Sequence, residues 1–176
     1  FETSSMISLS IADKNDTLEN ILQAYTEKES MNEEAQYKCD TCKQKCDAHR
    51  QIFISKLPKI LVFQLKRFYA DENGTKKKTH LIEFPEIDLN MEPFVAKRET
   101  KINTLYDLYA VVNHDERGWG IDEDSGDIKG HYYAFVKAEH NHKWYELNDG
   151  APPVKVDNVI TAYAYILFYK QKNSSV

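Results

Sequence analysis

The apolar residues of this chain occur mainly in short runs rich in β-branched and aromatic side chains, which favours strands over helices. The first run, Met6–Asp13, alternates Ile7, Leu9 and Ile11 with small polar residues and predicts a half-buried strand. Further strands are expected at Gln51–Ser55, Ile60–Phe68, Leu105–His114, His131–Lys137, Lys143–Leu147 and Tyr163–Tyr169. A chain of 176 residues is long enough to bury a substantial core, so one sheet-dominated unit is expected.

One helix is expected after the first run. Asp16 or Thr17 is a suitable N-cap, and the apolar residues that follow have the spacing of one helical face. These residues are Leu18, Ile21, Leu22 and Tyr25. We interpret the stripe as core packing and the fold class as α+β, dominated by antiparallel sheet.

Charge and composition exclude several functions. A net charge of −5 and a pI near 5.7 argue against nucleic-acid binding, which needs clustered Lys and Arg, and favour a basic partner. No apolar run approaches the roughly 20 residues that cross a bilayer, so no membrane partner is expected. Three cysteines, Cys39, Cys42 and Cys46, indicate a reducing compartment, cytoplasmic and/or nuclear. Because the chain starts at Phe1 rather than Met, we expect a fragment or a processed product.

Three segments are expected to lie outside the sheet. Residues 26–50 are polar and charged and predict an exposed excursion. Asp71–Thr79 contains the turn signal Asn73-Gly74 and predicts a loop. Asp115–Gly130 is acidic and glycine-rich, which makes it a candidate substrate gate.

The expected hairpin after His131 brings two polar side chains face to face. If Ala138–Asn141 is a four-residue loop, Lys137 pairs with His142 and His131 lies opposite Asn148. The amide carbonyl would then accept the imidazole N–H and fix the tautomer of the ring. A slip of one residue would place a neighbour of Asn148 there instead, and a strand-end histidine is also compatible with a structural role. The glycine before the histidine is expected to leave room for a substrate backbone.

Four motifs resemble those of ubiquitin-specific proteases, in the order of that family and over nearly the whole chain. They are the histidine box (Gly130–Phe135 followed by Trp144–Asp149), the central motif (Leu57–Leu61 with Gln64–Phe68), the last palm strand (Ala164–Tyr169) and the second half of the zinc-bearing fingers (Tyr37–Cys42). The resemblance implies a papain-like cysteine peptidase fold. Residues from about 30 to 50 would be part of the fingers, and residues 51–170 would form the palm. The thumb would be absent from this chain.

The resemblance also implies an activity, which is thiol-dependent hydrolysis of isopeptide and peptide bonds after the C-terminal glycine of ubiquitin. Ubiquitin and ubiquitinated proteins would be the partners. His131 is then the general base and Asn148 its orienting partner, while Asp149 matches a commonly acidic neighbour that supports the base.

Recognition of the ubiquitin tail is assigned to three further residues. Tyr132 matches an aromatic residue that lines the tail channel in the family. Asp122 and Asp124 are expected to pair with the arginines of the tail, which would contribute orientation and association rate.

The nucleophilic cysteine of the family lies in an Asn-x-x-Cys-like box, and this sequence contains no such box. We expect the nucleophile upstream of this chain, so that the parent protein is active and the chain alone is not. One alternative is a catalytically inactive ubiquitin-binding or scaffold module of the same fold. A small zinc-knuckle interaction protein is a further alternative.

No cofactor is expected for catalysis, and a structural zinc ion is expected only on a condition. Cys39 and Cys42 have knuckle spacing and would form half of a four-ligand site whose second Cys pair lies outside this chain. A closed site that adds Cys46 and His49, and free reduced cysteines, remain alternatives.

Overall fold

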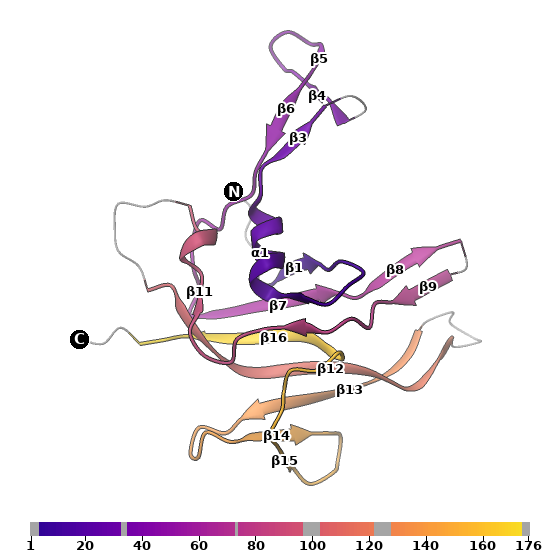
Figure 1. The fold of residues 1–176 in the computed structure, drawn as a ribbon, viewed down its shortest axis with the longest axis vertical. Helices are drawn as coiled ribbons and strands as arrows, with labels where there is room; N and C mark the ends of the chain where they lie inside the picture. Colours follow the sequence, from indigo (N-terminus) through magenta and orange to yellow (C-terminus); the bar gives the residue numbers. More distant parts are fainter. Residues whose placement is uncertain (1–3, 33–34, 73, 97–102, 122–127, 174–176) are drawn as a thin grey trace.

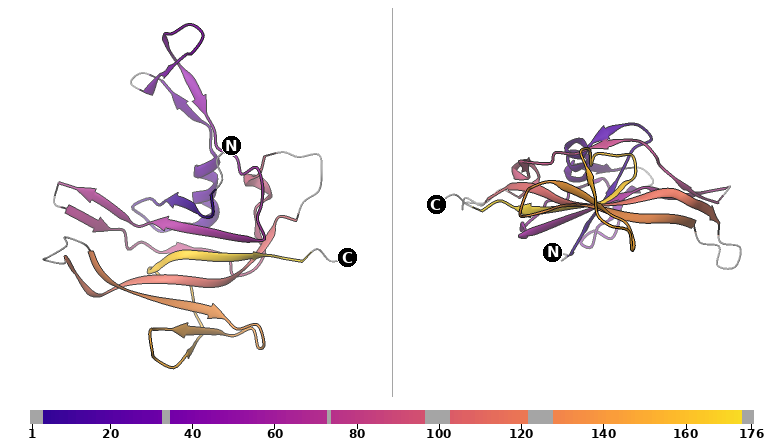
Figure 2. Two further views of the ribbon diagram at one scale, coloured as in Figure 1. Left: turned by 180° about the vertical axis from the view of Figure 1, so that it is seen from behind. Right: turned by 90° about the horizontal axis from the view of Figure 1, so that it is seen from below.

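The computed structural model describes all residues except 1–3, 33–34, 73, 97–102, 122–127 and 174–176. A twisted eight-stranded sheet forms the body, and a narrow arm projects away from it (Figure 1). The strand order is β1 (Ile7–Ser10), β7 (Ile60–Lys66), β16 (Ala164–Gln171), β12 (Leu105–Ile121), β13 (Ile128–Lys137), β14 (Trp144–Leu147) and β15 (Val154–Val156), with β11 (Leu89–Asn90) paired to β12. Seen from below, the sheet strands fan out along its twist (Figure 2).

The helix α1 (Leu18–Thr26) begins where the sequence predicts. Thr17 is the N-cap, and its Oγ1 accepts a hydrogen bond from the backbone N–H of Asn20 at 3.2 Å. Asp16 supports this turn because its Oδ1 accepts from the Asn20 side chain at 2.9 Å. Asp16–Thr17 also forms the short strand β2, which pairs with β10 (Ile82–Glu83).

The predicted apolar stripe of α1 is part of the core. Leu18, Ile21 and Leu22 are buried, and Tyr25 is partly buried against the same cluster. The helix packs against β1 and the short 3-10 helix η2 (Glu92–Phe94). The sheet contributes the buried residues Leu9, Leu61, Phe63, Leu65, Leu108, Val111 and Leu167.

Two predicted loops contain strands instead. Strand β12 continues to Ile121, and strand β13 begins at Ile128. The expected loop Asp115–Gly130 is therefore wrong over most of its length. The expected loop Asp71–Thr79 is mostly a hairpin of β8 (Phe68–Asp71) and β9 (Gly74–Lys77). In both cases cross-strand pairing outweighs the polar composition from which a loop was predicted.

The predicted strand Gln51–Ser55 is wrong. Only Ile54 makes a bridge, with Val95, and its backbone N–H donates to the carbonyl of Phe94 at 3.2 Å. The first strand is correctly predicted, but it pairs with β7 in parallel, whereas the other pairs of the large sheet are antiparallel. Residue patterns report which face of a strand is buried and say nothing of the direction of its neighbour.

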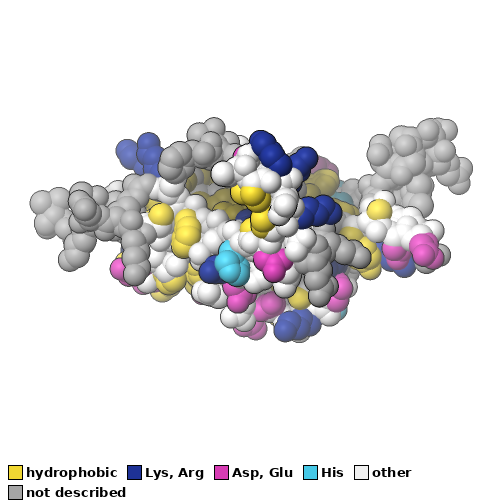
Figure 3. All heavy atoms as spheres, turned by 90° about the horizontal axis from the view of Figure 1, so that it is seen from above, with side chains coloured by type: hydrophobic (Ala, Val, Ile, Leu, Met, Phe, Trp, Pro, Cys, Tyr) yellow, Lys and Arg dark blue, Asp and Glu magenta, His cyan; other side chains and the backbone are white. Residues whose placement is uncertain are grey.

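The arm is the predicted exposed excursion. It consists of β3 (Glu29–Met31) with β6 (Ala48–Arg50) and, further out, β4 (Tyr37–Lys38) with β5 (Lys45–Cys46). Figure 3 looks down on the arm and shows Lys and Arg side chains at its end. In the part of the chain that the structure describes, no helix has the length and apolar character to cross a membrane.

Candidate active site

The structure brings His131 and Asn148 into contact. His131 lies on β13, and Asn148 directly follows the end of β14. Nε2 of His131 is 2.7 Å from Oδ1 of Asn148, which is a short hydrogen bond. The His131 side chain keeps 29% of its surface exposed, so a reacting group can reach it.

Asp149 is less closely placed. Its Oδ2 is 3.9 Å from Nε2 of His131, and 81% of its side chain is exposed, so solvent weakens any charge interaction between them. The backbone of Asp149 has a φ of 45°, a left-handed conformation that bends the chain directly after Asn148. This bend and the turn bond from Ala151 N–H to the Asn148 carbonyl (3.0 Å) position the amide beside the histidine.

The register from which this contact was predicted is wrong by two residues. Lys137 pairs with Trp144 rather than with His142, because the hairpin loop lies one residue further along the chain. The N–H of Ala138 donates to the Lys143 carbonyl at 2.9 Å and closes that loop. A shift of two residues keeps the same side chains on the same face, so the predicted contact survives although the predicted pairing does not.

Asn148 is held at both ends of its amide. Oδ1 faces His131, and Nδ2 donates to Oε1 of Glu146 at 3.1 Å. The Tyr133 ring stacks on the imidazole of His131 with 6.4 Å between centroids and 17° between planes. Because Oδ1 can only accept, Nε2 of His131 carries the hydrogen, and the lone pair is on Nδ1. The arrangement therefore provides an oriented general base.

The room beside Gly130 is occupied by another residue of the chain. A Cβ atom at Gly130 would lie 2.1 Å from Nε2 of His114. His114 is 2% exposed, and its ring is 4.4 Å from that of Tyr132 and 5.2 Å from that of Phe68, centroid to centroid. The glycine was expected to leave room for a substrate backbone. On the side where a Cβ atom would lie, this expectation is wrong, because the His114 ring fills that space.

Replacing Gly130 by Ala is expected to lower the melting temperature of the protein and any activity that depends on His131. The new methyl group must displace a ring that is enclosed by other aromatic rings, at a cost of about 1–3 kcal/mol. Because His131 is the next residue, the displacement also moves the general base. The double variant Gly130→Ala/His114→Ala should recover part of both losses, and a single variant as stable and active as the wild type would contradict this account.

The predicted tail-binding residues are only partly described. Tyr132 is 52% exposed beside His131, so its ring is available to a ligand. Partial burial, and secondarily Tyr165, raises the pKa of the Tyr132 hydroxyl, which stays neutral at physiological pH. Asp122 and Asp124 lie outside the described residues.

The three cysteines lie on the arm. Cys39 precedes a tight turn, and hydrogen bonds from the backbone N–H groups of Cys42 and Thr41 lower the pKa of its thiol. Cys42 Sγ is 3.7 Å from Cys46 Sγ, and this contact raises the pKa of Cys46. Backbone N–H groups directed at a sulfur suit a thiolate ligand, so Cys39 and Cys42 fit half of a zinc site.

The alternative closed metal site is not assembled. Nδ1 of His49 is 3.4 Å from Ser30 Oγ on the opposite strand of the arm. Among the described residues, no group of three or more His, Cys, Asp or Glu side chains is placed to hold a metal ion.

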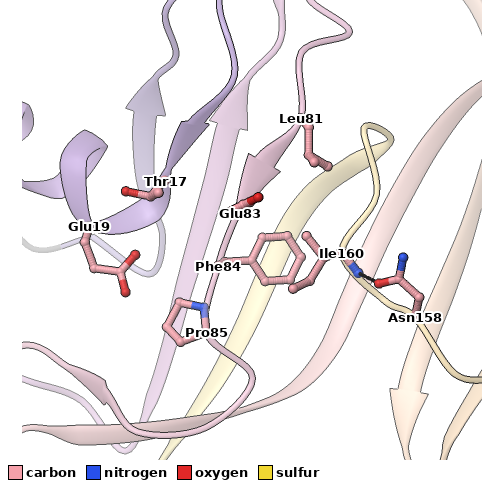
Figure 4. A pocket seen from close by; sticks show the side chains of 8 residues that line it. All are labelled: Thr17, Glu19, Leu81, Glu83, Phe84, Pro85, Asn158 and Ile160. Carbon is pink, nitrogen blue, oxygen red and sulfur yellow. Dashed lines mark hydrogen bonds between the residues drawn. The ribbon is translucent and has the colours of Figure 1, made fainter.

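An open pocket of about 520 Å³ lies between the start of α1, the segment around β10 and the chain before β16 (Figure 4). Its floor includes Phe84 and Ile160, and Glu19 and Glu83 stand at its border. The eight lining residues include neither a histidine nor a cysteine. This pocket therefore shares no residue with the His131 site, and its lining contains neither an imidazole base nor a thiol nucleophile.

Comparison with known proteins decides the family. The sequence profile described as ubiquitin carboxyl-terminal hydrolase matches residues 11–169. The chain belongs to the ubiquitin carboxyl-terminal hydrolase family. The expected papain-like cysteine peptidase fold with a predominantly antiparallel sheet is confirmed by this match and by the solved structures below.

The relatives of this chain are longer proteins. Ubiquitin carboxyl-terminal hydrolase 4 of Mus musculus is 34% identical over 157 residues, which are 89% of this chain and 15% of that protein. Ubiquitin carboxyl-terminal hydrolase 3 of Homo sapiens is 35% identical over 156 residues, which are 87% of this chain and 28% of that protein. A chain of the SAGA Ubp8/Sgf11/Sus1/Sgf73 DUB module bound to ubiquitin aldehyde superimposes with a TM-score of 0.74 and 33% identity, over 95% of this chain and 36% of that one. This chain thus spans well under two thirds of the length of each.

Two residues of the candidate site were not found from the sequence. Glu146 carried a signal, because residues two apart on a strand share a face and Glu146 is two before Asn148. His114 carried none, since its contact with Gly130 depends on the pairing of β12 with β13.

Proposed function

We propose that this chain is part of a deubiquitinase that hydrolyses isopeptide and peptide bonds after the C-terminal glycine of ubiquitin. It would supply the general base, its orienting amide and part of the ubiquitin-binding surface. The nucleophilic cysteine would come from a segment outside this chain, because the three cysteines present lie on the arm rather than beside His131. The observation that carries the proposal is the 2.7 Å hydrogen bond that His131 Nε2, on a partly exposed side chain of β13, donates to Oδ1 of Asn148, the residue after β14.

The proposed chemistry follows from the orientation of the imidazole. Nδ1 of His131 accepts the proton of the cysteine thiol, and the resulting thiolate attacks the carbonyl carbon of the terminal glycine. The imidazolium then donates its proton to the departing lysine amine as the C–N bond breaks. A water molecule, deprotonated by His131, hydrolyses the thioester and releases ubiquitin with a free carboxylate.

The comparisons support this proposal at the level of the family. The relatives are named ubiquitin carboxyl-terminal hydrolases, and two of the solved structures contain ubiquitin aldehyde or monoubiquitin. For this chain we propose ubiquitin and ubiquitinated proteins as partners, with Tyr132, Asp122 and Asp124 along the path of the tail. We further propose that Cys39 and Cys42 contribute to a structural zinc site completed by ligands from elsewhere in the protein.

The first test uses ubiquitin that carries a thiol-reactive group at its C-terminus. We expect it to label the native protein that contains this sequence, with a mass increase of one ubiquitin on a polypeptide longer than 176 residues. Mapping of the labelled peptide should identify a cysteine other than Cys39, Cys42 and Cys46. Reversible ubiquitin binding without labelling would overturn the catalytic proposal and favour a non-catalytic ubiquitin-binding module of the same fold.

A further inference from the structure

Glu146 contacts the end of the Asn148 amide that faces away from the histidine. Glu146 lies on β14 and Asn148 directly follows that strand, so the two residues, two positions apart, point to the same side. The Glu146 carboxylate accepts from Nδ2 of Asn148 at 3.1 Å, while Oδ1 of the same amide lies 2.7 Å from His131 Nε2. The three side chains therefore form a continuous chain of hydrogen bonds, from His131 through Asn148 to Glu146.

An amide alone does not determine the tautomer of a histidine. Rotated by 180°, the Asn148 side chain would present its NH₂ group to His131, and the ring could accept at Nε2 and carry its hydrogen on Nδ1. That tautomer has no lone pair on Nδ1 with which to accept a proton from a thiol. A carboxylate beside the amide excludes the rotated form, because it only accepts hydrogen bonds and repels the carbonyl oxygen.

Glu146 is suitably placed for this role. It is half-buried in the middle of the hairpin, opposite Phe135 of β13 and Val154 of β15. Lys155, the neighbouring basic residue on β15, pairs with Asp157 at 2.7 Å rather than with Glu146. Among the described residues, Asn148 is thus the group on which the Glu146 carboxylate acts directly.

We propose that Glu146 is a positioning residue, which selects the Asn148 orientation that leaves Nδ1 of His131 able to accept a proton. It also supplies a negative charge that a neutral Asn148 lacks, and this charge stabilises the imidazolium through the polarised amide. The inference rests on the proposed function for its kinetic consequences, while its consequence for the histidine tautomer does not.

The kinetic test uses the protein that contains this chain together with its nucleophile. Glu146→Ala is expected to lower kcat about tenfold, the lower end of the range found when an orienting hydrogen-bond partner is removed at metal sites, with KM for a ubiquitin substrate unchanged. Glu146→Gln retains a side-chain oxygen that can accept from Nδ2 and should recover most of this loss. Glu139→Ala is the matched control, because Glu139 is an exposed glutamate on the same hairpin that faces Lys170 at 3.5 Å.

The direction in which Glu146→Gln changes kcat in a second background distinguishes a positioning role from a merely structural one. In an Asn148→Asp background the acidic side chain needs no orientation, and Glu146 becomes a repelling neighbour. Glu146→Gln should therefore raise kcat in that background, although it slightly lowers kcat beside Asn148. A similar loss in both backgrounds would overturn the proposal.

The tautomer is read independently of activity by ¹⁵N chemical shifts of the His131 imidazole. We expect the Nε2–H form in the wild type and in Glu139→Ala, and a mixture of both tautomers in Glu146→Ala. An unchanged Nε2–H population in Glu146→Ala overturns the positioning role even if kcat falls. If Glu146→Ala shows the expected mixture of tautomers but the wild-type protein never cleaves ubiquitin, the proposed function fails while this inference stands.

Discussion

Replacing His131 by Ala is expected to abolish the proposed cleavage of ubiquitin, with a loss in kcat of about 10³-fold or more. Without the imidazole, the thiol has no partner that accepts its proton, and the departing amine has no donor. The substitution leaves no buried hole, because the His131 side chain is already 29% exposed. Folding and ubiquitin affinity should therefore change little.

The measurement is the steady-state cleavage of ubiquitin that carries a C-terminal fluorophore, alongside a direct binding assay. His140→Ala is the matched control, because His140 is exposed on the β13–β14 connection and should keep full activity. Asp149→Ala should lower kcat less than Asn148→Ala does, since Oδ2 of Asp149 lies 3.9 Å from Nε2 of His131 and Oδ1 of Asn148 lies 2.7 Å from it. Cleavage by His131→Ala at a rate near that of the wild type would falsify the assignment of the base.

Replacing Arg67 by Ala is expected to lower the free energy of unfolding by about 3–5 kcal/mol. Arg67 has no exposed surface, and its guanidinium donates to three carbonyls in two other segments of the chain. Nε donates to the carbonyl of Ala164 at 2.6 Å, and Nη1 donates to the carbonyls of Lys78 and His80, each at 3.0 Å. Alanine would leave three carbonyls without their donor as well as a cavity the size of the side chain.

The charge of Arg67 is part of this effect. Burial lowers the pKa of Arg67 to about 10, which still leaves the guanidinium protonated at neutral pH. A lysine cannot reproduce the planar fork of donors, so Arg67→Lys should be intermediate in stability. Because Ala164 begins β16, which pairs with β12, and β12 leads into the β13–β14 hairpin that contains His131, loss of Arg67 should also reduce the proposed activity.

Denaturation curves of the protein that contains this chain test this expectation. Arg50→Ala is the control, because Arg50 is 61% exposed on the arm and its contact with Glu29 is 3.9 Å long. Its effect should remain within about 0.5 kcal/mol. A loss of stability by Arg67→Ala no larger than that of Arg50→Ala would show that the three carbonyl contacts contribute nothing to folding.

Local patterns in the sequence were sufficient for much of the fold and for the central contact of the site. The helix cap at Thr17 and the buried stripe of α1 depend on residues within two turns of one another. The contact of His131 with Asn148 was predicted from a register that was wrong by two residues. The prediction was still correct, because the alternation of faces along a strand repeats every two residues. The resemblance of four motifs to ubiquitin-specific proteases was correct at the level of the family.

The tertiary structure decided what depends on residues far apart in the chain. The parallel pairing of β1 with β7, the absence of a strand at Gln51–Ser55 and the extension of β12 to Ile121 follow from which backbone groups find partners. The His114 ring over Gly130 and the burial of Arg67 are likewise set by segments brought together only on folding. Sequence alone determined the periodicity of each element and the residue types of the site. The physical reason for this division is that periodicity is a property of neighbouring residues, whereas pairing and burial belong to the folded chain as a whole.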